Sequence, residues 1–198
     1  FGLPSVCRLS DPDETDVAFE LDGLGHGSLP RTLARLGYRE GERVLFLGSV
    51  EGDRASSLAT AGRATALALR LGGLPLGAKP MRSWSARRFL DPYLRDVLLD
   101  WGIVVDTLET AAPWSKLDGL WRGVRTVLTA RPRTVAMTHL SHAYASGANL
   151  YFIFLTPMAG GDGDVILADY QALHGALVDA IIAHGGTLSH HHGIGEGA

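Results

Sequence analysis

The sequence lacks several features that would assign it to a class at once. Its 198 residues include one cysteine, Cys7, so an intrachain disulfide is excluded. The net charge is −3, with 18 basic against 21 acidic side chains, which gives no basic footprint for nucleic acid. No uninterrupted apolar run reaches the roughly 18–20 residues of a membrane span. We therefore expect neither a nucleic-acid partner nor a transmembrane helix.

Common motifs for phosphate and zinc are missing too. No Gly-x-Gly-x-x-Gly follows a strand and no Walker loop occurs, so the chain carries no recognisable phosphate-binding loop. Cys-x-x-Cys and His-Glu-x-x-His are likewise absent. What is present is an ordinary globular composition, 46% hydrophobic and 20% charged, which predicts one folded domain.

The hydrophobic pattern predicts an α+β fold. We expect an antiparallel or mixed sheet with helices on one face, because the strands at 135–143 and 149–155 are joined by too short a connection for a crossover. Every position from Leu150 to Leu155 is apolar, which indicates a strand buried on both faces, one of them covered by something outside this chain. The other elements follow in chain order. Strands are expected at 6–9, 44–47 and 103–107, helices at 53–71, 86–101, 113–131 and 164–184, a loop with at most one short helix at 20–42, and a last strand through the terminal histidines.

The histidines His190, His191 and His192 are the strongest chemical signal. Their unperturbed pKa lies near neutrality, so the run suits proton transfer, anion contact or metal binding. A zinc site would need further ligands that no motif supplies, and we expect a proton-handling or anion-binding role. On a strand, His190 and His192 would share one face.

Tyr151 and Arg95 each have a structural and a functional interpretation. Tyr151 is either a core tyrosine with its hydroxyl hydrogen-bonded at the rim, or part of a site with the nearby polar segment 141–144. Arg95 is either a surface side chain or an arginine whose planar guanidinium binds an anion, with Asp96 and Glu109 as candidate partners.

Four segments in this order resemble the C-terminal domain of FAD-linked oxidases, most closely the alkyldihydroxyacetonephosphate synthase branch. They are Phe89-Leu-Asp-Pro-Tyr-Leu-Arg-Asp96, Asp106-Thr-Leu-Glu-Thr-Ala-Ala-Pro-Trp114, Ser141-His-Ala-Tyr-Ala-Ser-Gly-Ala-Asn-Leu-Tyr-Phe152 and Leu188-Ser-His-His-His-Gly-Ile-Gly195. Residues 1–80 match the family only loosely. The resemblance implies an antiparallel sheet of ferredoxin-like halves whose uncovered face closes over the flavin ring.

The same resemblance implies the domain organisation, the cofactor and the site. Residues 1–198 would be one cap, or substrate, domain of a larger flavoenzyme, with FAD held mainly by an N-terminal domain outside this chain. The implied catalytic residues are Tyr151, His190, His191 and His192, and Arg95 would bind substrate. The residues expected near the cofactor are His142, Tyr144, Asn149, Gly193 and Gly195, and no metal is expected.

The implied reaction is exchange of an acyl for an alkyl group on a dihydroxyacetone phosphate ester, without net change of the flavin. The alternatives are oxidation of a 2-hydroxy acid or alcohol, and a non-catalytic remnant domain. Expected partners are the FAD domain of the same protein, a phosphorylated or hydroxy-acid substrate, a fatty alcohol and a second copy in a homodimer. The expected location is the cytoplasm, with peripheral membrane association as an option. Tyr151 and the histidines should share one apolar face, with the helix of Arg95 ending nearby.

Overall fold

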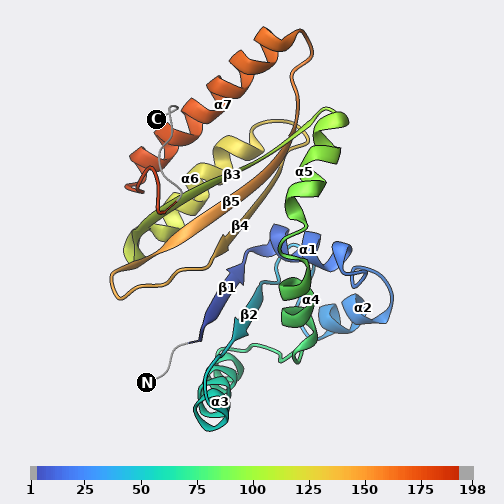
Figure 1. Ribbon diagram of the computed structural model, residues 1–198, viewed down its shortest axis with the longest axis vertical. Coiled ribbons are helices and arrows are strands. Elements are labelled where there is room, and N and C mark those ends of the chain that lie inside the picture. The colour runs from blue at the N-terminus through green and yellow to red at the C-terminus, as the bar shows by residue number, and fades with distance from the viewer. Residues whose placement is uncertain (1–3, 192–198) are drawn as a thin grey trace.

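The computed structural model describes residues 4–191 and shows a five-stranded antiparallel sheet in the order β2-β1-β4-β5-β3 (Figure 1). The α+β class predicted from the sequence is confirmed. The strands are β1 (Val6–Ser10), β2 (Leu45–Ser49), β3 (Ile103–Pro113), β4 (Val135–Leu140) and β5 (Gly147–Pro157). The helices are α1 (Pro12–Leu21), α2 (Ser28–Arg35), α3 (Arg54–Arg70), α4 (Lys79–Arg87), α5 (Asp91–Asp100), α6 (Leu117–Thr129) and α7 (Gly163–Ala183).

The main core lies between the β3–β5–β4 part of the sheet and the pair α6 and α7, which cover one face of it (Figure 1). Helix α6 buries Leu120, Val124 and Leu128 completely, and their spacing of four residues places them on one face of the helix, which packs against the sheet. Helix α7 contributes its own apolar face in the same way. Its buried residues are Leu173, Leu177 and Ile181.

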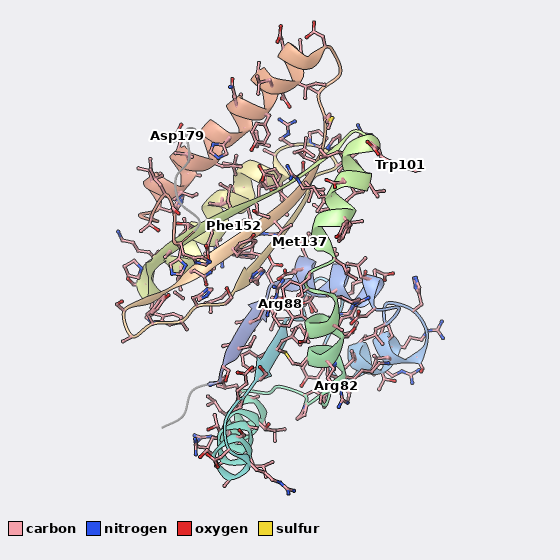
Figure 2. The ribbon with its side chains drawn as sticks, in the orientation of Figure 1. Arg82, Arg88, Trp101, Met137, Phe152 and Asp179 are labelled. Carbon is pink, nitrogen blue, oxygen red and sulfur yellow. The ribbon has the colours of Figure 1, made fainter. Side chains whose placement is uncertain are left out.

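The central strand β5 has two different faces. Phe152 and Phe154 point into the helix-covered core and are almost fully buried, while Tyr151, Ile153 and Leu155 on the opposite face are only half-buried. Figure 2 labels Phe152 on β5 and Met137 on the neighbouring β4. The continuous apolar run therefore fills one core completely and leaves an apolar strip on the face that α6 and α7 do not cover.

The N-terminal half is attached to this sheet through a short contact. Strand β1 pairs with β2 along its whole length but with β4 only through Leu9 opposite Leu140 and Ser10 opposite His139. The chain then turns at once into α1, whose cap residue Asp11 also accepts hydrogen bonds from Trp121 and Arg125 of α6. This anchors α1 beside the end of β4.

Three sequence predictions of local structure are wrong. The helix expected at 86–101 is split into α4 and α5, because Pro92 lies in the first turn of α5, where a proline needs no backbone N–H donor. Pro113 ends β3 instead of starting a helix, and a short 3₁₀ turn at Trp114–Lys116 precedes α6. The part of the expected last strand that the structure describes, up to His191, is irregular.

Two apolar features lie outside the core. By length and composition α7 could cross a membrane, which the search for uninterrupted apolar runs did not anticipate, yet its buried leucines and isoleucine make it a helix of the main core. Exposed large apolar side chains gather on α5 and the turn before it, among them Tyr93, Val97 and Trp101. Figure 2 shows Trp101 at the outer end of α5.

Candidate active site

Three polar side chains form a row across the sheet face that α6 and α7 leave uncovered. Tyr151 of β5 lies opposite Glu109 of β3 on one side and opposite His139 of β4 on the other. Cross-strand partners in an antiparallel sheet present their side chains on the same face. Glu109, Tyr151 and His139 therefore line one surface, in that order.

Glu109 is the centre of a histidine cluster. Its side chain is only 1% exposed, and its two carboxylate oxygens lie 3.2 Å from Nδ1 of His190 and 3.2 Å from Nδ1 of His191. The amide nitrogen of Asn149 donates a hydrogen bond of 2.6 Å to the same carboxylate. A buried carboxylate needs such donors, because desolvation without them is costly. One oxygen of Glu109 is thus within hydrogen-bond distance of Asn149 and His190, and His191 lies beside the other oxygen.

Glycines after α7 explain how the histidine segment reaches β3. Gly185 has φ 71°, a left-handed conformation typical of a helix stop. A Cβ on Gly186 would lie 2.6 Å from Oγ1 of Thr110, so only glycine lets the chain pass this close to β3. Thr187 then donates its backbone N–H to the carbonyl of Ala111 at 2.9 Å. This fixes the direction of the segment that carries His190 and His191.

The loop between β4 and β5 closes the cluster from the other side. Asn149 is fully buried, and its Oδ1 accepts the backbone N–H groups of Ser141 and His142 at 2.9 and 2.7 Å. The hydroxyl of Tyr144 lies 3.0 Å from Nε2 of His190. The ring of His142 contacts the rings of both His190 and His191 at centroid distances of 5.2 Å.

The charges in the cluster favour a neutral His142. Partial burial lowers the pKa of His142 most, and the neighbouring His190 lowers it further, against the opposing effect of Glu109. His142 is thus an uncharged imidazole near neutral pH, able to accept a proton or a hydrogen bond.

Four side chains of this cluster also have the composition of a metal site. Ligand atoms of Glu109, His142, His190 and His191 all lie within 4.8 Å of one another. However, the Nδ1 atoms of His190 and His191 are 2.8 Å apart, whereas nitrogen ligands about 2.0–2.1 Å from a tetrahedral zinc ion would be roughly 3.3 Å apart. A separation of 2.8 Å is that of a hydrogen bond. The geometry described here fits shared protons better than a bound ion.

The structure brings together most of the residues predicted to form a site. Tyr151, His142, Tyr144, Asn149, His190 and His191 lie around Glu109 or next to it in the row. His190 and His191 approach the same carboxylate, so the expected alternation of faces along a strand is wrong for this pair. His192, Gly193 and Gly195 lie outside the described residues.

Arg95 lies elsewhere. It is exposed on α5, and its charge acts on Tyr170 of α7, whose hydroxyl donates a hydrogen bond to Asp106. Asp106 pairs with the core residue Phe154 and therefore faces the helix-covered side of the sheet. The suggested pairing of Arg95 with Glu109 is replaced by contacts of Glu109 with the histidines and Asn149.

Sequence reasoning missed two residues, His139 in the row and Glu14 next to it. His139 stacks on Tyr151, with ring centroids 5.0 Å apart and planes inclined by 20°. Glu14 of α1 lies 3.0 Å from Nδ1 of His139 through one carboxylate oxygen. The available signal was strand alternation, since His139 and Ser141 are two positions apart on the same face of the predicted strand, but Glu14 carried none.

Together, the fold and the row define an antiparallel α+β domain with a row of polar side chains on the sheet face that α6 and α7 do not cover. The chain belongs to the family described as FAD linked oxidases, C-terminal domain, which it matches over residues 2–197. The cofactor of this family is FAD. The resemblance inferred from four segments is thereby confirmed.

Three similar proteins are named alkyldihydroxyacetonephosphate synthase. The chain is 34% identical to the alkyldihydroxyacetonephosphate synthase of Dictyostelium discoideum over 61% of its own length and 20% of that protein. It is 31% identical to the Caenorhabditis elegans synthase over 74% of this chain and 25% of that protein. For the Trypanosoma brucei brucei synthase the figures are 26% identity, 97% of this chain and 33% of that protein.

A solved alkyldihydroxyacetonephosphate synthase structure has the same fold, with a TM-score of 0.71 at 24% identity. The match covers 94% of this chain and 35% of the solved chain. The chain thus spans between a fifth and a third of the curated relatives it matches.

Proposed function

We propose that this chain forms the substrate-side wall of the active site in an FAD-dependent enzyme that exchanges an acyl for an alkyl group on a dihydroxyacetone phosphate ester. The observation that carries the proposal is the convergence of His190 and His191 on buried Glu109, beside Tyr151. The relatives named as alkyldihydroxyacetonephosphate synthases support this substrate class.

The uncovered sheet face is suited to the cofactor. Tyr151, Ile153 and Leu155 form a half-buried strip on β5, on the side away from α6 and α7. A flat strip of aromatic and apolar side chains fits the planar ring of a flavin. Because the sequence has no phosphate loop, the rest of FAD would be bound by the FAD domain of the same protein. When bound, FAD supplies the reactive ring next to this wall.

The chain itself would move protons. In an acyl-to-alkyl exchange the entering alcohol loses its hydroxyl proton, and the acyl group leaves as a carboxylic acid or its carboxylate. The imidazoles of His190 and His191 are suited to accept that proton, since Glu109 stabilises the imidazolium that forms. The hydroxyl of Tyr151, in the same row, is suited to donate to an oxygen of the substrate.

Substrate binding by Arg95 is retained as part of the proposal. Its guanidinium is exposed on α5 and able to bind a phosphate through two parallel hydrogen bonds. The charge of Arg95 lowers the pKa of Tyr170 against the larger effect of burial, and Tyr170 bonds Asp106 on the helix-covered side of the sheet. The substrate would therefore have to extend from Tyr151 past the β3 edge of the sheet to place its phosphate at Arg95.

The test uses the full-length protein. It should purify with bound FAD, and on addition of an acyl-dihydroxyacetone phosphate and a long-chain alcohol it should form the alkyl ether without bleaching the flavin. Anaerobic bleaching by a 2-hydroxy acid, with no ether formed, would instead identify an oxidase. A colourless protein that cannot be reconstituted with FAD would contradict both readings.

A further inference from the structure

A second carboxylate and imidazole lie on the other side of Tyr151, and the proposed function does not use them. His139 of β4 lies opposite Tyr151 in the strand register and stacks on its ring at 5.0 Å. Nδ1 of His139 is 3.0 Å from a carboxylate oxygen of Glu14. Glu14, His139 and the Tyr151 ring thus form one continuous series of contacts.

Both members of this pair are buried, whereas the histidines that approach Glu109 are more exposed. The side chains of His139 and Glu14 are 6% and 7% exposed. Arg8 of β1 donates a hydrogen bond of 2.5 Å to the same oxygen of Glu14. Burial by itself would raise the pKa of Glu14, but the hydrogen bond from His139 and the charges of His139 and Arg8 outweigh it and hold that pKa below its usual value. Glu14 is therefore ionised in the folded chain.

An ionised Glu14 fixes the state of His139. The carboxylate only accepts hydrogen bonds, so Nδ1 of His139 must carry a proton and donate it to Glu14. The ring can then neither flip nor exchange tautomers without losing this contact. The position of a tyrosine hydroxyl is set by χ1, which has three staggered rotamers, whereas rotation about χ2 only turns the ring about the axis that carries the hydroxyl. A fixed imidazole stacked against one face of the phenol blocks motion of the whole ring toward that side and so restricts where the hydroxyl lies.

The two members of the pair come from different halves of the chain. Glu14 lies on α1, directly after the short contact in which Ser10 of β1 pairs with His139. The N-terminal half therefore reaches the row through this pair. A buried ion pair is seldom more stable than apolar side chains of the same size, so stability alone does not account for it.

We infer that Glu14 and His139 are positioning residues for Tyr151, holding its phenol ring in the orientation in which its hydroxyl reaches the substrate. The inference rests on the proposed function, because it gives the pair a role only if Tyr151 takes part in the reaction. Neither residue touches the substrate in this view, and each acts through the tyrosine.

The decisive experiment is a double-mutant cycle in the full-length enzyme with FAD bound. Glu14→Gln keeps the shape of the side chain but removes its charge, and with it the preference for one His139 tautomer. We expect kcat to fall about tenfold or more, as for a misplaced reacting group, with KM changed less than about twofold. In a Tyr151→Phe background the same change should lower kcat by no more than about twofold, because the hydroxyl it positions is gone.

Two further variants serve as a control and as a substitute for Glu14→Gln. Asp16→Asn is the matched control, since Asp16 is also on α1 and also pairs with an arginine, Arg43, at 2.7 Å. It should keep the wild-type kcat. If Glu14→Gln does not fold, His139→Gln takes its place in the cycle, since a glutamine amide can still donate to Glu14 but removes the ring that stacks on Tyr151.

The possible failures are distinct. A Tyr151→Phe enzyme with wild-type turnover would overturn both the proposed function and this inference. If Tyr151→Phe is slow but Glu14→Gln is not, the inference alone is wrong. The inference is also wrong if the loss of kcat in the double variant equals the product of the losses in Glu14→Gln and Tyr151→Phe. Such independence is expected if Glu14 and His139 only stabilise the fold.

Discussion

The two carboxylates on either side of Tyr151 have opposite surroundings. Glu109 lies on the edge strand β3, and its partners His190 and His191 are 15% and 51% exposed, whereas Glu14 lies on α1 and its partner His139 is 6% exposed. An imidazole open to solvent can exchange protons with a substrate, while a buried one with its proton fixed can only orient a neighbour. One tyrosine thus has a proton-transfer side and a positioning side, made from different parts of the chain.

The largest effect expected on the proton-transfer side is that of Glu109→Gln. The amide keeps the volume but no longer stabilises an imidazolium on His190 or His191. Loss of one charge-assisted hydrogen bond corresponds to about 1.5–3 kcal/mol, or roughly ten- to 150-fold in turnover. Steady-state rates of the full-length enzyme measure it. Asp118→Asn, which breaks the exposed pair with Arg122 on α6, is the control that should change nothing.

The division of roles between Glu109, which serves proton transfer, and Glu14, which positions Tyr151, would be contradicted if Glu109→Gln kept more than about half of the wild-type turnover while Glu14→Gln lost most of it. The proton-transfer role would then have to move to the buried side. Equal losses in both variants would show that the two carboxylates do not differ in function as the exposure of their imidazole partners suggests.

A smaller effect is expected when the histidine segment is displaced and its chemistry is left intact. A Cβ in Gly186→Ala would lie 2.6 Å from Oγ1 of Thr110 and 3.0 Å from Ile181, so the segment after α7 must move. Overpacking of this kind destabilises by about 1–3 kcal/mol. We expect the free energy of unfolding in urea to fall by that amount and kcat to fall severalfold, because His190 and His191 shift away from Glu109.

Gly175→Ala is the matched control for that displacement. Gly175 lies within α7 and a Cβ there would meet nothing within 4 Å. Alanine should stabilise the helix by about 0.5–1 kcal/mol and leave kcat unchanged. Destabilisation of similar size by both substitutions would show that the close approach of Gly186 to β3 is unimportant.

The sequence predicted the parts of this arrangement that depend on local pattern. Hydrophobic pattern predicted α6 and β5 close to their observed bounds. It did not predict that the two faces of β5 differ, with Phe152 and Phe154 in the core and Tyr151, Ile153 and Leu155 only half-buried, because the run from Leu150 to Leu155 does not alternate. The break between α4 and α5 was missed because Pro92 was counted within one helix although it suits a new first turn. Local pattern also located the histidine run and Tyr151.

Long-range contacts could not be predicted in the same way. The bond between Glu14 and His139 joins residues 125 positions apart, and it exists because β1 pairs with β4 over only two residues before turning into α1. No periodicity encodes that register. Glu109 was noticed as an acid but was assigned to Arg95, since sequence spacing does not show which face of β3 it occupies.

We expect ionised Glu14 to make the stability of the folded chain depend on pH. Because the pKa of Glu14 is lowered in the folded chain, the unfolded state binds its proton first as pH falls. The stabilisation from ionised Glu14 is therefore present above its usual pKa, near 4.5, and is lost as pH falls through the lower folded value. We expect the free energy of unfolding, measured by urea titration, to fall less in Glu14→Gln than in the wild type when the pH is lowered from 6 to below the folded pKa of Glu14. Parallel curves would contradict the assignment.

The smallest effect, no change at all, is expected from removing metal ions. The Nδ1 atoms of His190 and His191 are 2.8 Å apart, closer than two nitrogen ligands of a tetrahedral zinc ion, about 3.3 Å apart. A shared proton explains that distance, so treatment with a chelator should leave turnover and bound FAD as they were. Elemental analysis of the purified full-length protein should find well under one zinc per chain. Stoichiometric zinc that is lost together with turnover, and restored with it, would make Glu109 a metal ligand and reverse the comparison. The proton-transfer role would then pass to His139 and its partner Glu14.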